Sequence, residues 1–218
     1  MRYNGLKNMI GGRPLDTTSR ILNEYHDYQT KIGSRVALYR AVAHAFGVVS
    51  ALYPGSHVDI APSLVIPKVT YVDSYRGTIQ FFRHLNEIQS FIEQEKEYPG
   101  TCELSFIGAA YENELKIDPV DLIISQYAGF AGQATKRYLK TGGILLSNDS
   151  HADATLAKFD EAFELIGVID EDNQLSSTHL EGFFQLSKGR EVDLANVRKT
   201  MKGPKYARMA ESYLFRKR

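Results

Sequence analysis

Several side chains that can accept or donate protons follow two apolar runs, at the points where we expect strands to end. The runs are residues 48–53 and 144–147, and the side chains after them are His57, Asp59, Asn148, Asp149, His151 and Asp153. Parallel strands of a doubly wound sheet end at the same edge, so we expect the two groups to share that edge. Imidazole titrates near neutral pH, which makes His57 and His151 candidate general bases, with Asp149 as a third catalytic candidate. A structural or solvent-exposed role for these residues stays open.

The same histidines and carboxylates are also of the types that bind divalent metal ions. No spacing among them matches a known ligand motif, so we expect no metal site. The single cysteine, Cys102, falls in an expected strand, and the sequence places no histidine beside it. We therefore exclude thiol catalysis. The chain also lacks a phosphate-binding G-x-x-x-x-G-K loop and a G-x-S-x-G turn.

A tight turn and a carboxylate lie eighteen positions apart in the best-patterned part of the chain. The first apolar run stops at Tyr53-Pro54-Gly55-Ser56, and a second β-rich run, Val69 to Val72, ends on Asp73. In open α/β sheets, this order of strand, turn, helix, strand and acid builds a nucleoside pocket. Gly55 lets the backbone approach a ligand, and Asp73 accepts hydrogen bonds from ribose hydroxyls. The alternatives are an ordinary Pro-Gly turn at Gly55 and a helix N-cap at Asp73.

The composition indicates one α/β domain with no charge bias. The 218 residues carry 26 basic and 26 acidic side chains, so no global charge attracts nucleic acid or membranes. The N-terminus lacks the apolar core of a signal peptide, and no apolar run reaches the length of a membrane span. A lone cysteine fits a reducing compartment. We expect a cytoplasmic protein; its oligomeric state cannot be read from the sequence.

Strand patterns alternate with helix patterns along the chain. Strands are expected at 48–53, 69–72, 102–107, 122–125, 144–147, 163–169 and 212–215. Helices are expected from Asp16 to about Tyr28 and at 34–46, 58–65, 76–97, 128–139, 154–163 and 193–201, with a short one from Ser177. This alternation predicts a doubly wound, mostly parallel seven-stranded sheet with helices on both faces and an antiparallel last strand. Residues 1–47 form an expected N-terminal helical cap, residues 48–218 the Rossmann-like domain, and residues 170–209 an insertion before the last strand.

Five ordered segments resemble the class I S-adenosylmethionine-dependent methyltransferase family. They are LYPGS, VTYVD, LSFIGAAYEN, VDLIISQYAGF and RYLKTGGILLSNDSHAD, within residues 48–168. The last is the most specific, because a basic helix end, Lys-Thr-Gly-Gly and an aliphatic strand are similar to the family's signature before its fifth strand. The chain departs from the family pattern in two places. Its first loop has one glycine, and Gly108-Ala109-Ala110 stands where the family often has Gly-Asp-Ala.

The resemblance implies S-adenosylmethionine as cofactor and a set of contacts at the strand ends. The cofactor-binding residues it implies, together with the two argued above, are Tyr53, Pro54, Gly55, Ser56, Asp73, Ser74, Gly108, Ala109, Tyr111, Ser125, Gln126 and Tyr127. Gly108, Ala109 and Tyr111 would border the adenine, and Ser125 to Tyr127 would lie at the methyl-donor end. Each of these residues has a plain alternative in loop packing or strand-end hydrogen bonding.

The main functional hypothesis is a methyltransferase acting on a small-molecule or peptide acceptor that the sequence does not identify. The N-terminal helices and residues 170–209 would cover the cleft, with aromatic side chains that serve either an acceptor pocket or the core. A second hypothesis is a catalytically inactive protein of the same fold that binds a nucleoside or a partner chain. A third is a nicotinamide-dependent oxidoreductase, which a sheet without the antiparallel last strand would favour. Strand four lacks the Asn/Asp-Pro-Pro-Tyr motif of enzymes that methylate nucleic acids.

Overall fold

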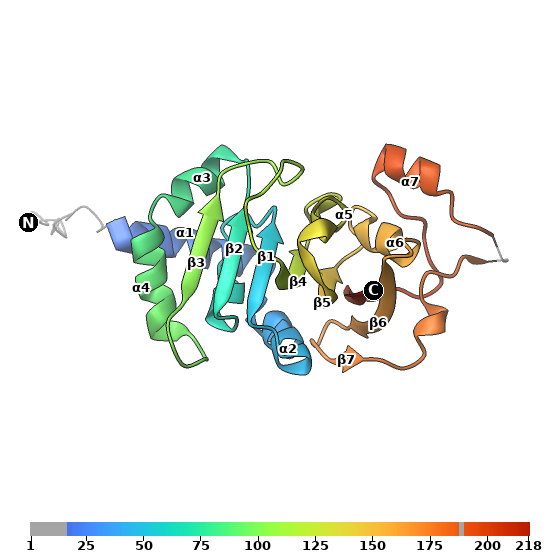
Figure 1. Cartoon of the computed structure of the whole chain (residues 1–218), viewed down its shortest axis with the longest axis horizontal. Helices are drawn as coiled ribbons and strands as arrows, with labels where there is room; N and C mark the ends of the chain where they lie inside the picture. Colours follow the sequence, from blue (N-terminus) through green and yellow to red (C-terminus); the bar gives the residue numbers. More distant parts are fainter. Residues whose placement is uncertain (1–16, 188–189) are drawn as a thin grey trace, which may run out of the picture.

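The computed structural model describes residues 17–187 and 190–218, and these residues are built around one eight-stranded sheet (Figure 1). The strand order is β3-β2-β1-β4-β5-β8-β6-β7. The expected irregular segment 1–15 and the expected cap Asp16 lie outside the described residues. The sheet confirms the predicted α/β class and doubly wound order. The eighth strand, β7, is a two-residue addition at one edge.

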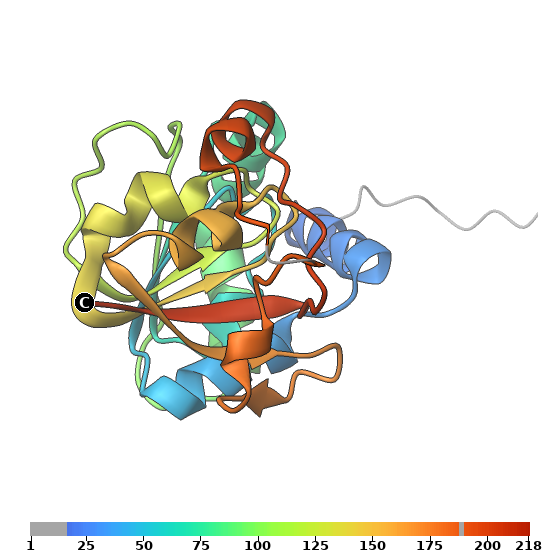
Figure 2. The same ribbon diagram turned by 90° about the vertical axis from the view of Figure 1, so that its right-hand side faces the viewer.

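The first five strands along the chain are parallel, and the last long strand is antiparallel. The strands are β1 (Ser50–Pro54), β2 (Lys68–Val72), β3 (Glu103–Ile107), β4 (Val120–Ser125), β5 (Leu139–Ser147), β6 (Phe163–Ile169), β7 (Leu175–Ser176) and β8 (Ser212–Lys217). β8 pairs antiparallel with both β5 and β6. Figure 2, viewed from that end of the sheet, shows β8 in red across the view. The predicted insertion of the last strand beside strand six is confirmed.

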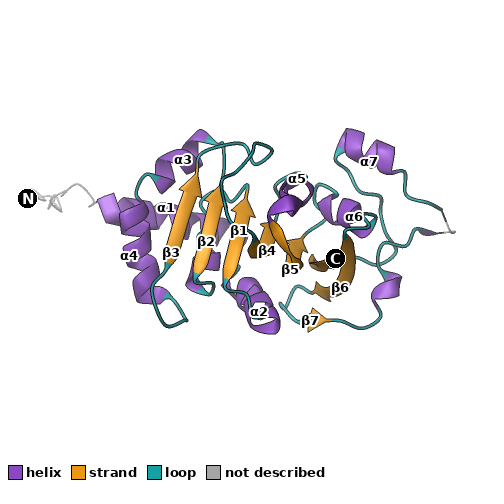
Figure 3. Cartoon of the chain, viewed as in Figure 1, coloured by secondary structure: helices purple, strands orange, loops and turns teal. Residues whose placement is uncertain are grey.

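Helices cover both faces of the sheet (Figure 3). Their bounds are α1 (Thr17–Ile32), α2 (Val36–Phe46), α3 (Arg76–Phe82), α4 (Leu85–Glu95), α5 (Ala131–Thr135), α6 (Asp153–Lys158) and α7 (Leu194–Thr200). Helices α1 to α4 bury their apolar sides in one core on one face of the sheet, and α6 packs into a second core on the other face. The predicted helical cap is thus part of the first helical layer, with Tyr25 buried against Phe91.

The segment 58–65 was expected to be a helix, and the structure corrects this. Only a 3-10 turn, η1 (Ala61–Leu64), forms there, with Pro62 in its first turn. Proline supplies no N–H donor, and Pro67 follows shortly after, so a regular α-helix cannot extend through the segment. All residues from Val58 to Ile66 are buried. Burial and a few turn hydrogen bonds, such as that from the Ile66 amide to the Pro62 carbonyl at 2.8 Å, therefore hold this connection in place of a regular helix.

Two other expected helices are shorter than the pattern predicts. The segment 76–97 divides at Arg83 and His84 into α3 and α4. Buried Phe81, Ile88 and Ile92 keep helical spacing across the break, so the apolar period cannot reveal it. The segment 128–139 contains only the five residues of α5, followed by a 3-10 turn, η2 (Lys136–Tyr138). The expected helices at 154–163 and near Ser177 are reduced to α6 and to the 3-10 turn η3 (Leu180–Gly182).

One face of the sheet stays partly open because the connection from β3 to β4 contains no helix (Figure 3). A cavity of about 1150 Å³ lies there, at the amino ends of β1 to β4, with Lys68, Thr70, Glu103 and Ser105 in its lining. Lys68 pairs with Glu103, and Thr70 bonds to Ser105. Because ligands of open α/β sheets bind outside the opposite, carboxyl ends of the strands, we interpret this cavity as a solvated sheet face. None of the described helices is long and apolar enough to cross a membrane.

Candidate functional site

The strand order places the candidate site above β1 and β4. The chain runs outward from β1 to β2 and β3, then returns to form β4 on the other side of β1. At such a switch point the loops that leave the two strands diverge, and a crevice opens at their carboxyl ends. The loop after β1 contains Gly55 and His57, and the loop after β4 contains Tyr127. In Figure 1 this is the edge to which the arrowheads of β1, β2 and β3 point.

Asp73 lies on the same edge as Gly55, as predicted. The Gly55 amide donates to the Val72 carbonyl at 2.8 Å. The Asp73 carboxylate accepts the His57 amide on Oδ2 at 3.0 Å and the Tyr75 amide on Oδ1 at 2.7 Å. The second bond forms a local turn just before α3, whose N-cap is Tyr75, so Asp73 is not the helix N-cap. A carboxylate has about four acceptor positions, and these two amides leave capacity on each oxygen.

Gly55 is surrounded differently from our expectation. Its φ of +66° is a conformation that favours glycine, and a Cβ built on it would lie 2.4 Å from the Cβ of Ala128. The Tyr111 ring is the next neighbour, and its hydroxyl donates to the Ala128 carbonyl at 2.8 Å. The close backbone approach at Gly55 is therefore made by the loop after β4. The expected space for a ligand directly against Gly55 is taken by Ala128.

Ser125 belongs to a buried hydrogen-bond network around Asp153. Asp153 Oδ2 accepts from the Ser125 hydroxyl at 2.6 Å and the Gly132 amide at 2.8 Å, and Oδ1 accepts from the Gln133 amide at 3.2 Å. Ser147 donates to the same carboxylate at 3.5 Å. Asp153 thus joins the ends of β4 and β5 to the start of α5. Despite these donors, burial raises the pKa of Asp153 to about 6.

Gln126 and Asn148 form a second buried network at the same edge. The Asn148 side-chain amide donates to Gln126 Oε1 at 2.9 Å, and Gln126 Nε2 donates to the Ser212 hydroxyl at 3.1 Å. These bonds tie together the ends of β4 and β5 and the start of β8. Both side chains are buried, so their hydrogen-bonding groups serve the sheet. Of the three residues expected at the methyl-donor end, only Tyr127 is exposed.

A buried charge cluster anchors the N-terminal helices to the first loop. Asp59 Oδ2 accepts from the Tyr39 hydroxyl at 2.9 Å and the Tyr53 hydroxyl at 3.2 Å, and Arg35 Nη1 lies 3.6 Å away. Tyr53 and Asp59 therefore point beneath the helices and away from the open edge. Burial raises the pKa of Asp59, and Arg35 opposes that shift. Arg35 was not predicted; it falls in the first turn of the helix expected at 34–46, and its one sequence signal is its place shortly after Gly33.

Three aromatic rings stack beside Asp73. The His57 ring lies between Tyr28, with centroids 5.0 Å apart, and Tyr75, at 5.9 Å. His57 itself has a φ of +50°, and Tyr75 is 61% exposed. This stack brings α1, the first loop and the residue before α3 together at the edge. His57 is the one catalytic candidate that lies beside Asp73.

The other two catalytic candidates lie further along the sheet, after β5. Asp149 accepts the Thr155 amide at 2.7 Å and the Thr155 hydroxyl at 2.8 Å, which fixes the start of α6. Burial raises the pKa of Asp149. His151 contacts Ser150, at 3.1 Å between the ring Nδ1 and the hydroxyl. Among the described residues, no three or more His, Cys, Asp or Glu side chains are grouped to hold a metal ion.

The remaining predicted contacts divide between exposed and buried positions. Ser74 and Gly108 are exposed, Ala109 and Tyr111 are half-buried, and Pro54 and Ser56 are buried. The Asp73 amide donates to the Ile107 carbonyl, which puts Ser74 and Gly108 at neighbouring strand ends. The aromatics expected over the cleft mostly belong to the core. Phe183 and Phe184, for example, are 3% and 5% exposed and pack on Tyr213.

The backbone at this edge is held in unusual conformations. His57, Tyr127 and Ala152 have φ values of +50°, +58° and +66° in the loops after β1, β4 and β5. Residues other than glycine adopt this region at a cost of about 1–3 kcal/mol, which the surrounding contacts must offset. Such positions cluster at functional sites. Four other non-glycine residues with positive φ among the described residues, Asn173, His179, Phe184 and Met201, lie in later segments, so this feature agrees with a site at the edge but does not single it out.

Comparisons with known proteins give matches among solved structures. No protein-family model matches the chain, and no curated protein does. One match is the O-methyltransferase from Bacillus cereus in complex with S-adenosylhomocysteine (11% identity, 73% of this chain and 88% of that chain, TM-score 0.49). Another is the plantazolicin methyltransferase BpumL with the same ligand (13% identity, 94% of this chain and 92% of that chain, TM-score 0.49). A third is a methyltransferase from Geobacter sulfurreducens (10% identity, 71% of this chain and 85% of that chain, TM-score 0.47).

The close approach at Gly55 gives a first prediction. Gly55→Ala places a Cβ 2.4 Å from Ala128 and keeps a positive φ, whereas Gly142 has a φ of +80° with nothing within 4 Å. Gly142→Ala should lose only the backbone term, about 1–2 kcal/mol. Gly55→Ala should lose about 1–3 kcal/mol more through overpacking. Urea denaturation measures the free energy of unfolding of both variants. Equal losses in the two variants would contradict the packed contact between Gly55 and Ala128.

Asp153 gives a second prediction, in the pH dependence of stability. Its folded pKa of about 6 lies above the ordinary value of 3.8, so between these pH values the folded state retains a proton that the unfolded state releases. Its contribution is full below pH 3.8 and is lost as the pH rises to about 6. A pKa difference of this size corresponds to about 3 kcal/mol. Urea denaturation between pH 4 and 7 should show this decline in the wild type relative to Asp153→Asn; parallel curves would refute it.

Proposed function

We propose that the chain is an S-adenosylmethionine-dependent methyltransferase whose cofactor binds at the carboxyl edge of β1, β2 and β4. The observation that carries the proposal is the half-buried Asp73 carboxylate beside the switch point, with acceptor capacity left on both oxygens. A vicinal diol offers two O–H donors that match two carboxylate oxygens, and hydrogen bonds to a charged acceptor are the stronger kind. The methyl acceptor, a small molecule or a peptide, is not identified.

The residues present fit the cofactor at its nucleoside end. Asp73 would hold the ribose hydroxyls, and Ser74, Gly108 and Ala109 would border the adenine at the neighbouring strand ends. Tyr75, exposed and stacked on His57, offers an aromatic face for the base. Tyr127 would lie at the amino-acid end. Ala128 and Tyr111 cover Gly55, so the Gly55 backbone is not itself part of the binding surface.

The bound cofactor would supply an activated methyl group on a sulfonium. The protein would hold the acceptor and that methyl group in the right relative position. Holding an acceptor nucleophile in line with the methyl contributes most of the rate when the electrophile is already activated. Of the three candidate bases, His57 is the one in a loop that borders the proposed cofactor site, and its ring is stacked between Tyr28 and Tyr75. It would accept a proton from an oxygen or nitrogen acceptor. Asp149 is committed to Thr155, and His151 lies after β5.

A nicotinamide cofactor fits this edge less well. Dinucleotides place their pyrophosphate at the N-terminus of the helix that follows the first strand. Here that connection carries only the four-residue 3-10 turn η1, which starts six residues after Gly55. The antiparallel β8 also differs from the sheet that would favour an oxidoreductase. A sulfonium nucleoside carries no phosphate, so it needs no such helix.

The inactive nucleoside-binding protein remains the second candidate. The observation in its favour is the contact of Ala128 with Gly55, which narrows the edge where a first loop would meet the cofactor. That protein would bind the nucleoside without transferring a methyl group. Transfer of label from methyl-labelled S-adenosylmethionine to an acceptor separates the two.

Ligand-dependent stability tests the proposed function. S-adenosylhomocysteine at 100 times its dissociation constant should raise the free energy of unfolding by about 2.7 kcal/mol, and NAD should have no effect. Asp73→Ala should abolish the response. The matched control is Asp170→Ala, because Asp170 also bonds two nearby amides, of Asp172 and Gln174, at the end of β6. Thermal shift assays measure the response to the ligand in the wild type, in Asp73→Ala and in Asp170→Ala, which should respond as the wild type does. A response that survives in Asp73→Ala would show that the ribose lies elsewhere.

A further inference from the structure

Two opposite charges lie on either side of Tyr127, at the end of the site away from Asp73. The Arg35 guanidinium carbon lies 5.0 Å from the centroid of the Tyr127 ring. The Tyr127 hydroxyl donates to Glu211 Oε1 at 3.1 Å. Arg35 comes from the turn between α1 and α2, Tyr127 follows β4, and Glu211 immediately precedes β8. Three segments far apart in sequence thus converge on one exposed ring.

The Arg35 guanidinium has more hydrogen-bond donors than its contacts within the protein use. Its side chain is 15% exposed, and its contacts with Tyr53 and Asp59 both use Nη1. Guanidinium has five N–H donors in a planar fork, which matches the two oxygens of a carboxylate. The contact of its guanidinium carbon with the Tyr127 ring places the group beside the edge of the site. These two contacts use neither Nε nor Nη2, although the Tyr28 hydroxyl also lies near the guanidinium group.

Tyr127 itself is held in position by strain and by contacts. Its φ is +58°, its amide donates to Asn148 Oδ1 at 3.4 Å, and its ring is 52% exposed. A positive φ in a tyrosine needs compensation from its surroundings. Arg35 and Glu211 supply part of it. The Tyr127 ring therefore contacts both the positive Arg35 and the negative Glu211.

We propose that Arg35 and Glu211 together bind a zwitterionic α-amino acid group, with the carboxylate on Arg35 and the ammonium on Glu211. This inference rests on the proposed function, because S-adenosylmethionine and S-adenosylhomocysteine carry such a group and simpler nucleosides do not. An anion alone would face the Glu211 carboxylate, and a cation alone would face Arg35. A neutral zwitterion satisfies both charges. The pair thus selects adenosyl amino acids over bare nucleosides.

The test compares two ligands that differ in the amino acid group. S-adenosylhomocysteine carries it, whereas 5′-methylthioadenosine has the same nucleoside and thioether without it. Calorimetric titration should show that Arg35→Lys weakens S-adenosylhomocysteine by about 10-fold or more, because lysine lacks the planar fork. Glu211→Gln should weaken it by about 2- to 5-fold, as expected for an exposed charge. Both variants should bind 5′-methylthioadenosine as the wild type does.

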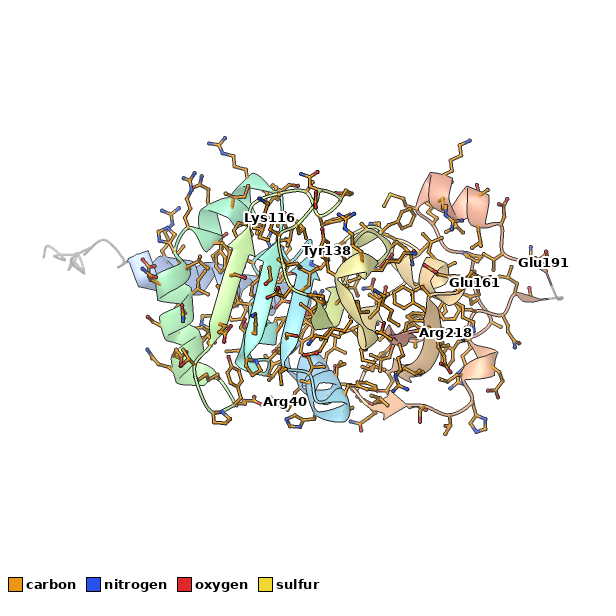
Figure 4. The ribbon with its side chains drawn as sticks, viewed as in Figure 1. Arg40, Lys116, Tyr138, Glu161, Glu191 and Arg218 are labelled. Atoms are coloured by element: carbon orange, nitrogen blue, oxygen red, sulfur yellow. The ribbon has the colours of Figure 1, made fainter. Side chains whose placement is uncertain are left out.

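Arg40→Lys is the matched control. Arg40 lies on α2, and its Nε donates to Glu97 Oε2 at 2.6 Å. Figure 4 shows Arg40 at the lower edge of the view, away from the strand arrowheads. The Arg40→Lys protein should bind both ligands as the wild type does. Glu211 is exposed, so its substitution keeps the test valid even if Arg35→Lys disturbs the cluster around Asp59. Equal weakening of both ligands, or no change in either, would overturn the inference. A wild type that binds neither ligand would instead refute the proposed function.

Discussion

The hydrogen bonds of the Asp73 carboxylate hold together the part of the candidate site on which the proposed function depends. By accepting the amides of His57 and Tyr75, this one charge fixes the loop after β1 against the start of α3. The carboxylate stays half-buried, so it avoids the large desolvation cost of a fully buried charge. It also keeps acceptor capacity for a ligand. A structural role and a binding role are therefore compatible in the same group, because the amides use only part of its acceptors.

The edge around Asp73 is held together by polar networks in place of a glycine-rich loop. Asp59 ties the first loop to the N-terminal helices, and Asp153 ties the ends of β4 and β5 to α5. These carboxylates are fully buried, and burial raises the pKa of each. The single glycine of the first loop admits Ala128 from the next loop. Thus the departures of this sequence from a glycine-rich pattern coincide with a loop that packing and buried hydrogen bonds hold in place.

Local patterns in the sequence predicted the strands well and the side-chain environments poorly. Residues 163–169 formed the expected strand, because apolar runs bounded by turn residues report directly on local structure. The position of Asp73 on the same edge as Gly55 also followed from the sequence, since parallel strands end together. The helix expected at 58–65 failed because Pro62 and tertiary packing outweighed helical preference. That change turned Asp59 away from the edge and into the cluster with Arg35.

Strand neighbours were predicted, but the side-chain contacts between distant loops were not. Ala128 meets Gly55 across 73 positions of the chain, and no local pattern marks the contact. Tyr127 meets Glu211 across 84 positions. Ser125 and Gln126 were expected at a ligand, but their partners Asp153 and Ser212 come from later segments. Residue type and strand position identify which groups reach the edge. Only the assembled fold shows which of them are already satisfied.

Binding of a ribose diol by Asp73 can be measured with a cycle that changes both the ligand and the protein. Calorimetry would compare S-adenosylhomocysteine with its 2′-deoxy analogue on the wild type and on Asp73→Asn. If the carboxylate binds the hydroxyl, removal of that hydroxyl weakens binding to the wild type by about 10-fold or more, as for a hydrogen bond to a charged group, and has little effect on the variant. The same loss of affinity in both proteins would contradict the account.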